Sequence, residues 1–277
     1  MSLNNKQRRD QILARIYELG HVEVKELAAE IMVSEATVRR DLRTLADEGR
    51  LELVYGGATL PRASDFSFRT KATRNVEAKR VIGRLAADRV ADADQVFLDS
   101  GTTCYEMAPH LRRKRGVSII VNSARLAVDL GASPDLSVIL IAGHYRPDRM
   151  DTVGPLAAST IDQLRGFRAF LGADGLSTDF GVTAGDIESA HLYRQVIRNA
   201  REAILVADHS KFLTPSLFKI AEWDAFSMVI TDQRPNAQWL EFLNDKGIEV
   251  IYPKEEDAPG QPGDAPNGRE VQSEMKT

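Results

Sequence analysis

Cysteine is almost absent from this sequence of 277 residues, and long hydrophobic runs are absent altogether. The single cysteine, Cys104, excludes an internal disulfide and a zinc site built from several thiolates. No stretch approaches the roughly 18 consecutive apolar residues that a membrane-spanning helix needs. The first residues, MSLNNKQRRDQ, lack the apolar core of a signal peptide. We therefore expect a cytosolic protein that does not associate with a membrane.

The composition is not extreme in any class of residue. With 27% charged and 43% hydrophobic residues, the chain is ordinary for a folded protein. Collagen-like and wholly disordered chains are therefore excluded. At roughly 150 residues per domain, the length predicts two domains, or one large domain with an appendage.

The net charge of −4 is concentrated at the C-terminal end of the chain. Beyond residue 252 there are three basic and six acidic side chains, so that the remainder has 33 basic residues against 34 acidic ones. The same segment has four prolines, three glycines and almost no large apolar side chains. Because such a segment cannot bury enough surface to offset its ordering entropy, we predict a disordered tail over 253–277.

Residues 1–60 have the pattern of a small domain of three helices and a hairpin. Apolar residues at helical spacing predict two helices, the first ended by Gly20: Ile12, Leu13, Ile16 and Leu19, then Val24, Leu27, Ala28 and Ile31. Ser34 is placed to cap a third helix that ends near Gly49. Leu51 and Leu53 then alternate as a strand, and Gly56-Gly57 can turn the chain into a second strand over 58–60.

This order of elements is typical of a winged helix-turn-helix domain, and the exposed face of the third helix predicts contacts with double-stranded DNA. Short polar groups at its start can meet base edges or phosphates in the major groove, and Arg39, Arg40 and Arg43 can neutralise phosphates or pair with guanine. The alternative is an ordinary solvated helix face, since residues 1–60 hold nine basic and ten acidic residues. Any positive potential must therefore be local, on Lys6, Arg8, Arg9 and the third helix.

A second domain is predicted over 81–252, after a polar and basic linker at 61–80. The segments between seven short apolar runs are long enough for crossover helices. The runs predict strands over 96–98, 117–121, 138–141, 169–172, 204–207, 228–230 and 248–252. This pattern indicates a doubly wound α/β domain. Such domains bind ligands at the carboxyl ends of their strands, near a topological switch point.

The residues that directly follow these strands are small, hydroxylated or charged, which predicts a site for a small anion. Ser100-Gly101-Thr102-Thr103 lies between a strand and a helix, where exposed N–H groups, hydroxyls and the helix dipole can hold a phosphate. Lys211, after another strand, can neutralise it. The Gly-Lys-Ser/Thr of a Walker loop is missing, so ATP chemistry is not expected. Taken alone, the loop could also be a simple capped turn.

Other reactive side chains favour no further chemistry. Cys104 falls in the first turn of the helix that follows this loop, as a small residue does, and His144 and His209 fall in loops. Because no three ligands have metal-binding spacing, we expect neither a metal nor a cofactor.

Two sets of motifs resemble the DeoR family of bacterial transcriptional regulators. VSEATVRRDLRTLADEGRLELVYGGATL, over 33–60, resembles the DNA-binding domain of that family, with Tyr55 where histidine is commoner before the two glycines. LDSGTT, VNSARLA, FLGADGLSTDFGVTAGDIESA and ILVADHSKF resemble its effector domain, which is similar in fold to ribose-5-phosphate isomerase and glucosamine-6-phosphate deaminase. In the family this domain senses phosphorylated sugars or related metabolites. The resemblance extends over residues 6–252.

The resemblance also implies which residues bind DNA and ligand. At or near DNA it implies Ser34, Thr37, Arg39, Arg40, Arg43, Tyr55 and Gly56, with Asp41 orienting neighbouring arginines. Around the phosphate it implies Ser100, Gly101, Thr102 and Thr103, with Asn122, Ser123 and Lys211 nearby. At the sugar end it implies Lys79, Asp99, Asp174, Gly181 and Glu188. His144 and Leu213 replace glycines common in the family, so the rim of the pocket is expected to differ.

We therefore expect a repressor of sugar or carbohydrate metabolism genes that is a homodimer or homotetramer, binds an operator and is released by a phosphorylated sugar. One alternative is a sugar-phosphate isomerase or deaminase with an added N-terminal domain, which would need a carboxylate base such as Asp174, Asp186 or Glu188. However, Gly175-Leu176-Ser177 follows Asp174 where the isomerases have further acidic residues. A DNA-binding protein whose second domain has lost its ligand is the other alternative.

Overall fold

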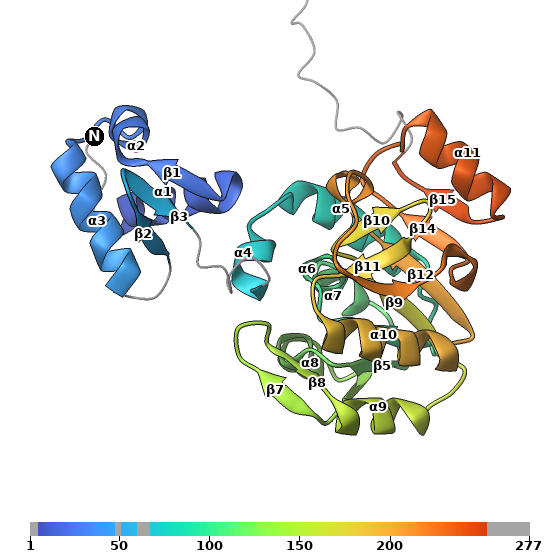
Figure 1. The fold of residues 1–277 in the computed structure, drawn as a ribbon. Helices are drawn as coiled ribbons and strands as arrows, with labels where there is room; N and C mark the ends of the chain where they lie inside the picture. The colour runs from blue at the N-terminus through green and yellow to red at the C-terminus, as the bar shows by residue number, and fades with distance from the viewer. Residues whose placement is uncertain (1–4, 48–50, 60–66, 254–277) are drawn as a thin grey trace, which may run out of the picture.

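The computed structural model describes residues 5–47, 51–59 and 67–253 (Figure 1). Gly49, predicted to end the third helix, and Leu60, predicted to end the hairpin, lie outside these residues. Residues 254–277 of the tail predicted to be disordered also lie outside them. Within the described part of the chain, no helix is long and apolar enough to cross a membrane.

The N-terminal domain is a winged helix-turn-helix, as predicted. Its elements in chain order are α1 (Asn5–Leu19), β1 (His21–Glu23), α2 (Val24–Glu30), α3 (Glu35–Asp47), β2 (Glu52–Val54) and β3 (Gly57–Thr59). The strands form an antiparallel sheet in the order β1-β3-β2, so the wing has one strand more than the predicted hairpin. The sequence gives no signal for β1 because one apolar residue, Val22, is too few to establish a period of two.

Side chains from all three helices and from the sheet form one small core in this domain. It includes Ile12 and Ile16 of α1, Leu27 of α2, and Val38 and Leu42 of α3, each at most 2% exposed. Ser34 caps α3, since its hydroxyl accepts a hydrogen bond from the backbone N–H of Thr37 at 3.2 Å. This packing fixes the direction in which the polar face of α3 points.

The second domain is built on a seven-stranded sheet in which all neighbouring strands are parallel (Figure 1). All seven predicted strands are present, with ends shifted by one or two residues. They are β4 (Gln95–Leu98), β5 (Val117–Val121), β6 (Leu136–Leu140), β9 (Arg168–Leu171), β12 (Glu202–Val206), β14 (Met228–Ile230) and β15 (Glu249–Ile251). Their order is β15-β14-β12-β9-β4-β5-β6.

Helices cover both faces of the sheet, and the two faces have separate cores because successive strand residues point to opposite sides. On one face pack α5 (Val76–Asp88), α6 (Thr102–Tyr105), α7 (Ala108–Leu111) and α8 (Ala124–Gly131). On the other face pack α9 (Pro155–Asp162), α10 (Ile187–Asn199) and α11 (Ala237–Asp245). In β4, for example, Phe97 belongs to the second core while Val96 and Leu98 belong to the first. The doubly wound architecture predicted from the sequence is therefore confirmed.

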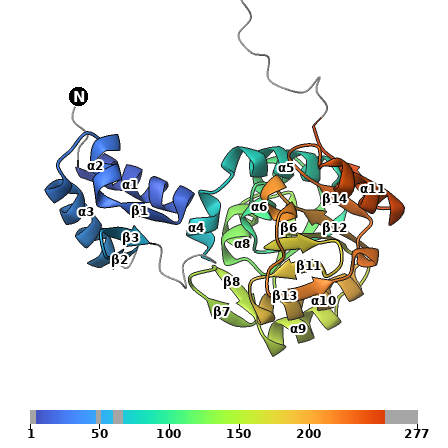
Figure 2. The same ribbon diagram turned by 45° about the horizontal axis from the view of Figure 1, so that its top comes forward.

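Several short elements outside the parallel sheet were not predicted. They are the hairpin β7 (His144–Arg146) and β8 (Asp151–Val153), the antiparallel sheet of β10 (Gly175–Ser177), β11 (Gly181–Ala184) and β13 (Phe218–Ala221), and the 3-10 helices η2 (His209–Phe212) and η3 (Trp223–Ala225). Helix α4 (Phe68–Ala72) lies within the range expected to be a linker, and Figure 2 shows it against α6. Each is too short for its periodicity to be recognised.

The strand order reverses between β4 and β9. From β4 the chain proceeds outward through β5 to β6, and from β9 it proceeds in the other direction through β12 and β14 to β15. In an open α/β sheet, the crevice at such a switch point is where ligands bind. A ligand-binding site is therefore expected at the loops after β4 and β9.

We predict that Gly83→Ala destabilises the protein, although alanine favours a helix over glycine by about 1 kcal/mol. A Cβ on Gly83, in α5, would lie 2.5 Å from the backbone carbonyl of Glu106, so the helix must shift. Relieving such overpacking costs roughly 1–3 kcal/mol. Chemical denaturation measures the change. The matched control is Gly131→Ala in α8, where a Cβ has no atom within 4 Å; this variant should be neutral or slightly more stable. Equal effects of the two substitutions would contradict the steric argument.

Candidate functional site

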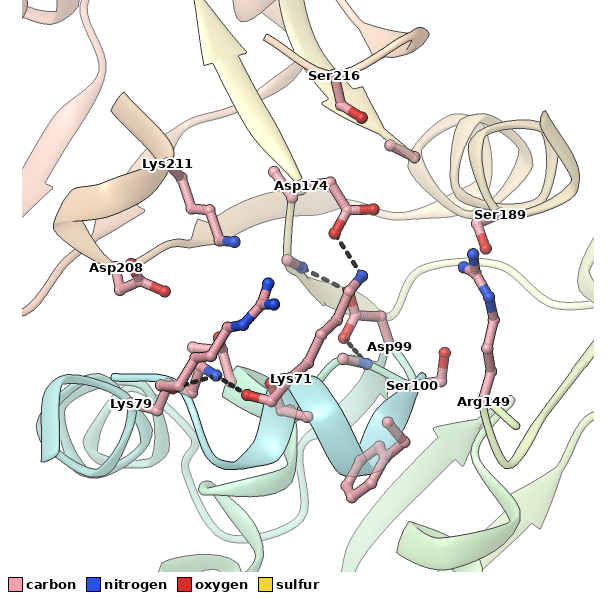
Figure 3. A pocket seen from close by; sticks show the side chains of 18 of the residues that line it. Lys71, Lys79, Asp99, Ser100, Arg149, Asp174, Ser189, Asp208, Lys211 and Ser216 are labelled. Carbon is pink, nitrogen blue, oxygen red and sulfur yellow. Dashed lines mark hydrogen bonds and ion pairs between the residues drawn. The ribbon is translucent and has the colours of Figure 1, made fainter. Parts of the chain in front are cut away.

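A cavity of about 380 Å³ opens at the switch point between β4 and β9. Its wall comes from the loops after β4, β9 and β12, from α4 and the turn to α5, and from the β7–β8 hairpin and α10. Its polar lining residues are Lys71, Arg74, Asn75, Lys79, Asp99, Ser100, Thr102, Thr103, Arg149, Asp151, Asp174, Ser189, Tyr193, Asp208, Ser210, Lys211 and Ser216. Segments more than 100 residues apart in the sequence thus meet around one space (Figure 3).

Asp99 joins the two strands at the floor of the cavity. It directly follows β4 and is 2% exposed, and its two carboxylate oxygens accept hydrogen bonds from the backbone N–H groups of Gly101 (2.7 Å) and Gly172 (2.6 Å). Burial raises the pKa of Asp99, and these hydrogen bonds act against the rise. A Cβ on Gly101 would lie 2.8 Å from this carboxylate, so the loop needs glycine here. Asp99 therefore shapes the loop.

The loop that Asp99 shapes presents its hydroxyls to the cavity. Within the described residues, the side chains of Thr102 and Thr103 have no hydrogen-bond partner, although each is less than 10% exposed. Both begin α6, so their backbone N–H groups have no acceptor within the helix. An anion at this position could accept hydrogen bonds from these hydroxyls and from these backbone N–H groups.

A network of buried ions supports the loop from the side of the hairpin. Ser100 donates a hydrogen bond from its hydroxyl to Asp151 at 3.0 Å. Arg146 holds Asp151 with two hydrogen bonds of 2.7 and 2.8 Å, and also donates to Asp186 at 2.8 Å. Burial would raise the pKa of Asp186, but hydrogen bonds from Ser189 and Arg146 lower it to about 2. Arg149, which pairs with Asp186, lines the cavity on this side (Figure 3).

Helix α4 closes the opposite side with Lys71. The ammonium group of Lys71 lies 2.5 Å from Asp174, which follows β9. Burial would raise the pKa of Asp174, but the charge and hydrogen bond of Lys71 outweigh it and the pKa is lowered. Lys79, 5% exposed on α5, donates to the carbonyls of Lys71 and Arg74, the latter at 2.6 Å. Burial lowers the pKa of Lys79 to about 8.

The loop after β12 completes the wall. Asp208 accepts hydrogen bonds from Asn75 at 2.9 Å and from the backbone of Ser210 at 3.0 Å, which fixes η2. Lys211 extends from η2 into the cavity (Figure 3). In the part of the chain that the structure describes, Lys211 has no ion-pair partner within 4 Å. Its charge is therefore available to a ligand.

Charge and hydrogen-bond capacity together suit this cavity to an anion. Five basic residues line it (Lys71, Arg74, Lys79, Arg149 and Lys211) against four aspartates (Asp99, Asp151, Asp174 and Asp208). Each aspartate accepts hydrogen bonds from the protein, whereas the threonine hydroxyls and Lys211 remain as donors. A phosphate offers the acceptors that such donors require.

The structure brings eight of the twelve predicted ligand-binding residues to this cavity: Lys79, Asp99, Ser100, Gly101, Thr102, Thr103, Asp174 and Lys211. Asn122, Ser123, Gly181 and Glu188 do not line it. Asn122 and Ser123 are fully buried, and Ser123 caps α8. Gly181 has a φ of +89° in β11. Glu188 points outward beside Arg146, at 3.7 Å, with 46% of its side chain exposed.

Several lining residues were missed from the sequence. Lys71, Arg74 and Asn75 lie in the segment expected to be a linker, and Arg149 and Asp151 lie in the unpredicted β7–β8 hairpin. The basic composition of residues 69–80 was the only feature of the sequence that could have pointed to an anion site there. Tyr193 and Ser189 on α10 gave none, because a polar residue on a helix is ordinarily solvated.

On the N-terminal domain, the predicted DNA-binding residues lie on α3, directly before it and at the tip of the wing. Arg40 and Arg43 are exposed on α3, and no ion pair engages them among the described residues. Arg39 pairs with Glu35 at 2.8 Å. Tyr55 is fully exposed at the tip of the wing, next to Gly56.

Asp41 and Arg8 have a different role from the one expected. Asp41 is 5% exposed and pairs with Arg8 of α1 at 2.5 Å and with Arg9 at 3.9 Å. It therefore joins α3 to α1 and does not orient the arginines of α3. Arg8, with 11% of its side chain exposed, is part of the domain's internal structure.

The described residues contain no cluster of potential metal ligands. No group of three or more His, Cys, Asp or Glu side chains suited to a metal is found among residues 5–47, 51–59 and 67–253. Cys104 is buried in α6, where its thiol lies 3.4 Å from the carbonyl oxygen of Phe170. Burial raises the pKa of this thiol well above its usual value, so it is not a reactive thiolate.

We predict that Lys79 makes folding stability depend on pH in the alkaline range. Its pKa is about 8 in the folded protein and 10.5 when unfolded, so between these values the unfolded chain binds the extra proton and stability rises with pH. The slope is at most about 1.4 kcal/mol per pH unit. Denaturation of the wild type and Lys79→Met across this range measures it. The free energy of unfolding should rise with pH in the wild type by this additional amount, and not in Lys79→Met. If the free energies of unfolding of the two proteins change with pH in parallel, Lys79 is not the titrating group.

Comparison with known proteins finds two protein families that match different parts of the chain. Residues 8–63 match the DeoR-like helix-turn-helix domain, and residues 74–233 match the DeoR C terminal sensor domain. The chain is 31% identical to the HTH-type transcriptional repressor CsqR of Escherichia coli over 92% of its length and 98% of that protein. It is 28% identical to the glycerol-3-phosphate regulon repressor of the same species, over 90% of its length and 99% of that protein.

Among solved structures, ribose 5-phosphate isomerase A from Neisseria gonorrhoeae is similar to 49% of this chain and 53% of its own, with 15% identity and a TM-score of 0.35. The assignment to a family rests instead on the two matched domains and the full-length relatives. With a winged helix-turn-helix domain followed by the matching sensor domain, the chain belongs to the DeoR family of DNA-binding transcriptional regulators.

Proposed function

We propose that this protein represses genes of sugar or carbohydrate metabolism and is released from its operator by a phosphorylated sugar bound in the cavity at the switch point. The observation that carries the proposal is the excess of basic residues and free hydroxyl donors around that cavity. The phosphate would lie on Ser100–Thr103 with Lys211 beside it. The sugar hydroxyls would lie toward Asp174, whose carboxylate can accept their hydrogen bonds.

The relatives support this ligand class by their names alone. One is a glycerol-3-phosphate regulon repressor, and another is a putative aga operon transcriptional repressor, 32% identical over 88% of this chain. The first name includes a phosphorylated three-carbon compound. A cavity of about 380 Å³ has room for a ligand of that size or of a five- or six-carbon sugar phosphate.

Turnover of such a ligand is disfavoured by the state of the three carboxylates that could serve as the base in the isomerase alternative. A general base for sugar isomerisation works best with a pKa near the working pH. Asp174 has a lowered pKa because Lys71 lies against it, and the pKa of Asp186 is about 2. Glu188 points away from the cavity. These residues favour binding without reaction, so we propose a sensor and not an isomerase or deaminase.

DNA binding would require at least two copies of the chain. The half-sites of an operator must match the symmetry of the protein at about 10 bp per helical turn. We therefore propose a homodimer or homotetramer in which the ligand changes the spacing of two helix-turn-helix domains. A complete switch needs a ligand that prefers one state by about 10⁴-fold.

Fluorescence anisotropy on labelled DNA from upstream of the protein's own gene tests the proposal, with a scrambled duplex as control. Measurements at about 0.15 M salt suppress purely electrostatic binding. Selective binding that one phosphosugar of a panel abolishes is the expected result. Selective binding that no phosphosugar alters would contradict the ligand class, and equal binding to both duplexes would contradict operator recognition at this site.

We expect Arg40→Ala to weaken operator binding without changing the affinity for the phosphosugar. Loss of an arginine contact to a base costs about 1–3 kcal/mol, and loss of a phosphate contact reduces the salt dependence by about one ion. Anisotropy at several salt concentrations distinguishes the two. The matched control is Arg84→Ala, which removes an exposed arginine from α5 in the other domain. If the control weakens binding equally, the α3 face is not the DNA-binding surface.

We expect the double variant Thr102→Ala with Lys211→Ala to bind the operator but to ignore its inducer. Hydrogen bonds to a charged group contribute about 1.5–3 kcal/mol each, so ligand affinity should fall at least tenfold. Calorimetry measures the ligand and anisotropy the DNA. The matched control, Thr160→Ala with Lys246→Ala, removes the same two groups from a half-buried position on α9 and an exposed position after α11. Loss of both activities in the Thr102 and Lys211 variant would refute the division into two sites.

A further inference from the structure

Among the described residues, α4 is the first helix after the wing, and it also forms a wall of the cavity. It begins at Phe68, nine positions after Thr59 at the end of β3, and it contributes Phe68 and Lys71 to the cavity lining. At five residues it is far shorter than the roughly 12–15 residues that an isolated helix needs in water. Its contacts with the second domain must therefore hold it in place.

One group of these contacts is aromatic. Phe68 is 6% exposed and meets the ring of Tyr105 edge-on at 5.5 Å, with the guanidinium of Arg125 over both rings at 5.4 and 4.9 Å. The backbone N–H of Phe68 also donates to the carbonyl of Asp148 at 3.0 Å. These contacts fix the first turn of α4 on α6 and α8.

The other contacts are polar and involve residues that line the cavity. Lys71 pairs with Asp174 at 2.5 Å, and Lys79 donates to the carbonyls of Lys71 and Arg74. Figure 3 shows Lys71 reaching across the cavity to Asp174, with Ser100 nearby. The charge of Lys71 also opposes the burial that raises the pKa of Asp99, at the start of the anion-binding loop. The charge of Lys71 thus influences the ionisation of both Asp174 and Asp99.

A phosphorylated ligand would compete for both partners of this ion pair. Its phosphate attracts Lys71, and its hydroxyl groups can donate to the carboxylate of Asp174. We infer that the Lys71–Asp174 ion pair holds α4 in the position in which the protein binds DNA, and that a phosphorylated ligand releases α4 by separating the pair. This inference rests on the proposed function, since it assigns Lys71 as the residue that transmits occupancy of the cavity toward the wing.

The first experiment needs no ligand. Lys71→Met, Asp174→Asn and the double variant are compared for affinity to the upstream DNA by anisotropy. Each single variant should weaken binding about tenfold, within the range of typical allosteric couplings, and the double variant should be no weaker than either. Lys246→Met, which removes a surface ion pair with Asp224 at 2.9 Å, is the matched control and should bind normally. Normal binding by Lys71→Met would overturn the inference.

A conservative variant guards against loss of folding. Lys71→Arg keeps the positive charge and can still reach Asp174, so it should restore operator binding. Thermal unfolding shows whether Lys71→Met retains its second domain. If Lys71→Arg binds DNA as weakly as Lys71→Met while both remain folded, the ion pair is not what holds α4.

The second experiment uses the wild-type chain and inorganic phosphate. Hydrogen exchange is followed in peptides from 67–75 and from 99–103. Phosphate should protect 99–103 and speed exchange in 67–75, because the ion pair opens as the anion binds. Protection of 99–103 with unchanged exchange in 67–75 would overturn the inference alone. No protection of 99–103 would count against the anion site of the proposed function, and the DNA experiment would still decide the role of the ion pair.

Discussion

The hydrogen bonds of the Asp99 carboxylate are the interaction on which the candidate site of the second domain depends most. The carboxylate links the end of β4 to Gly172 after β9, at the point where the two halves of the sheet diverge. Two strands that part at their carboxyl ends leave a crevice, and Asp99 fixes its width through backbone hydrogen bonds. The conformation of residues 100–103 follows, because next to this carboxylate there is room only for glycine at position 101. The protein's own hydrogen bonds thus hold this loop in place.

Around this point, ion pairs determine which charges remain for a ligand. Arg146 is committed to Asp151 and Asp186, and its network supports Ser100 from behind. Lys79 is committed to the carbonyls at the end of α4. Lys211 is not engaged in an ion pair within the described chain, and Lys71 is engaged with a carboxylate that itself faces the cavity. In the function proposed above, recognition of an anion and control of α4 would therefore use the same small set of cations.

The sequence predicted the strands of the parallel sheet and missed the short elements around that sheet for a physical reason. The inner strands of the parallel sheet are buried on both faces and are mainly apolar, such as Met228–Ile230, which the sequence shows as short apolar runs. A strand of three residues such as β7 or β10 has neither a run nor a period, and it exists only because the rest of the fold pairs it. Helix α4 was missed for the same reason. These short elements supply part of the cavity wall.

By itself, the sequence determined the family, the winged helix-turn-helix, the order of the strands along the chain and the polar residues that follow them. These depend on local pattern, since a strand end and the start of the next helix are neighbours in the chain. The tertiary structure alone decided which polar residues face the cavity and which charges are neutralised. Lys71 and Asp174 are 103 positions apart, and Arg146 and Asp186 are 40 apart. Ion pairs and hydrogen bonds form only between groups that are close in space, and the fold around the neighbouring parallel strands β4 and β9 brings these groups together.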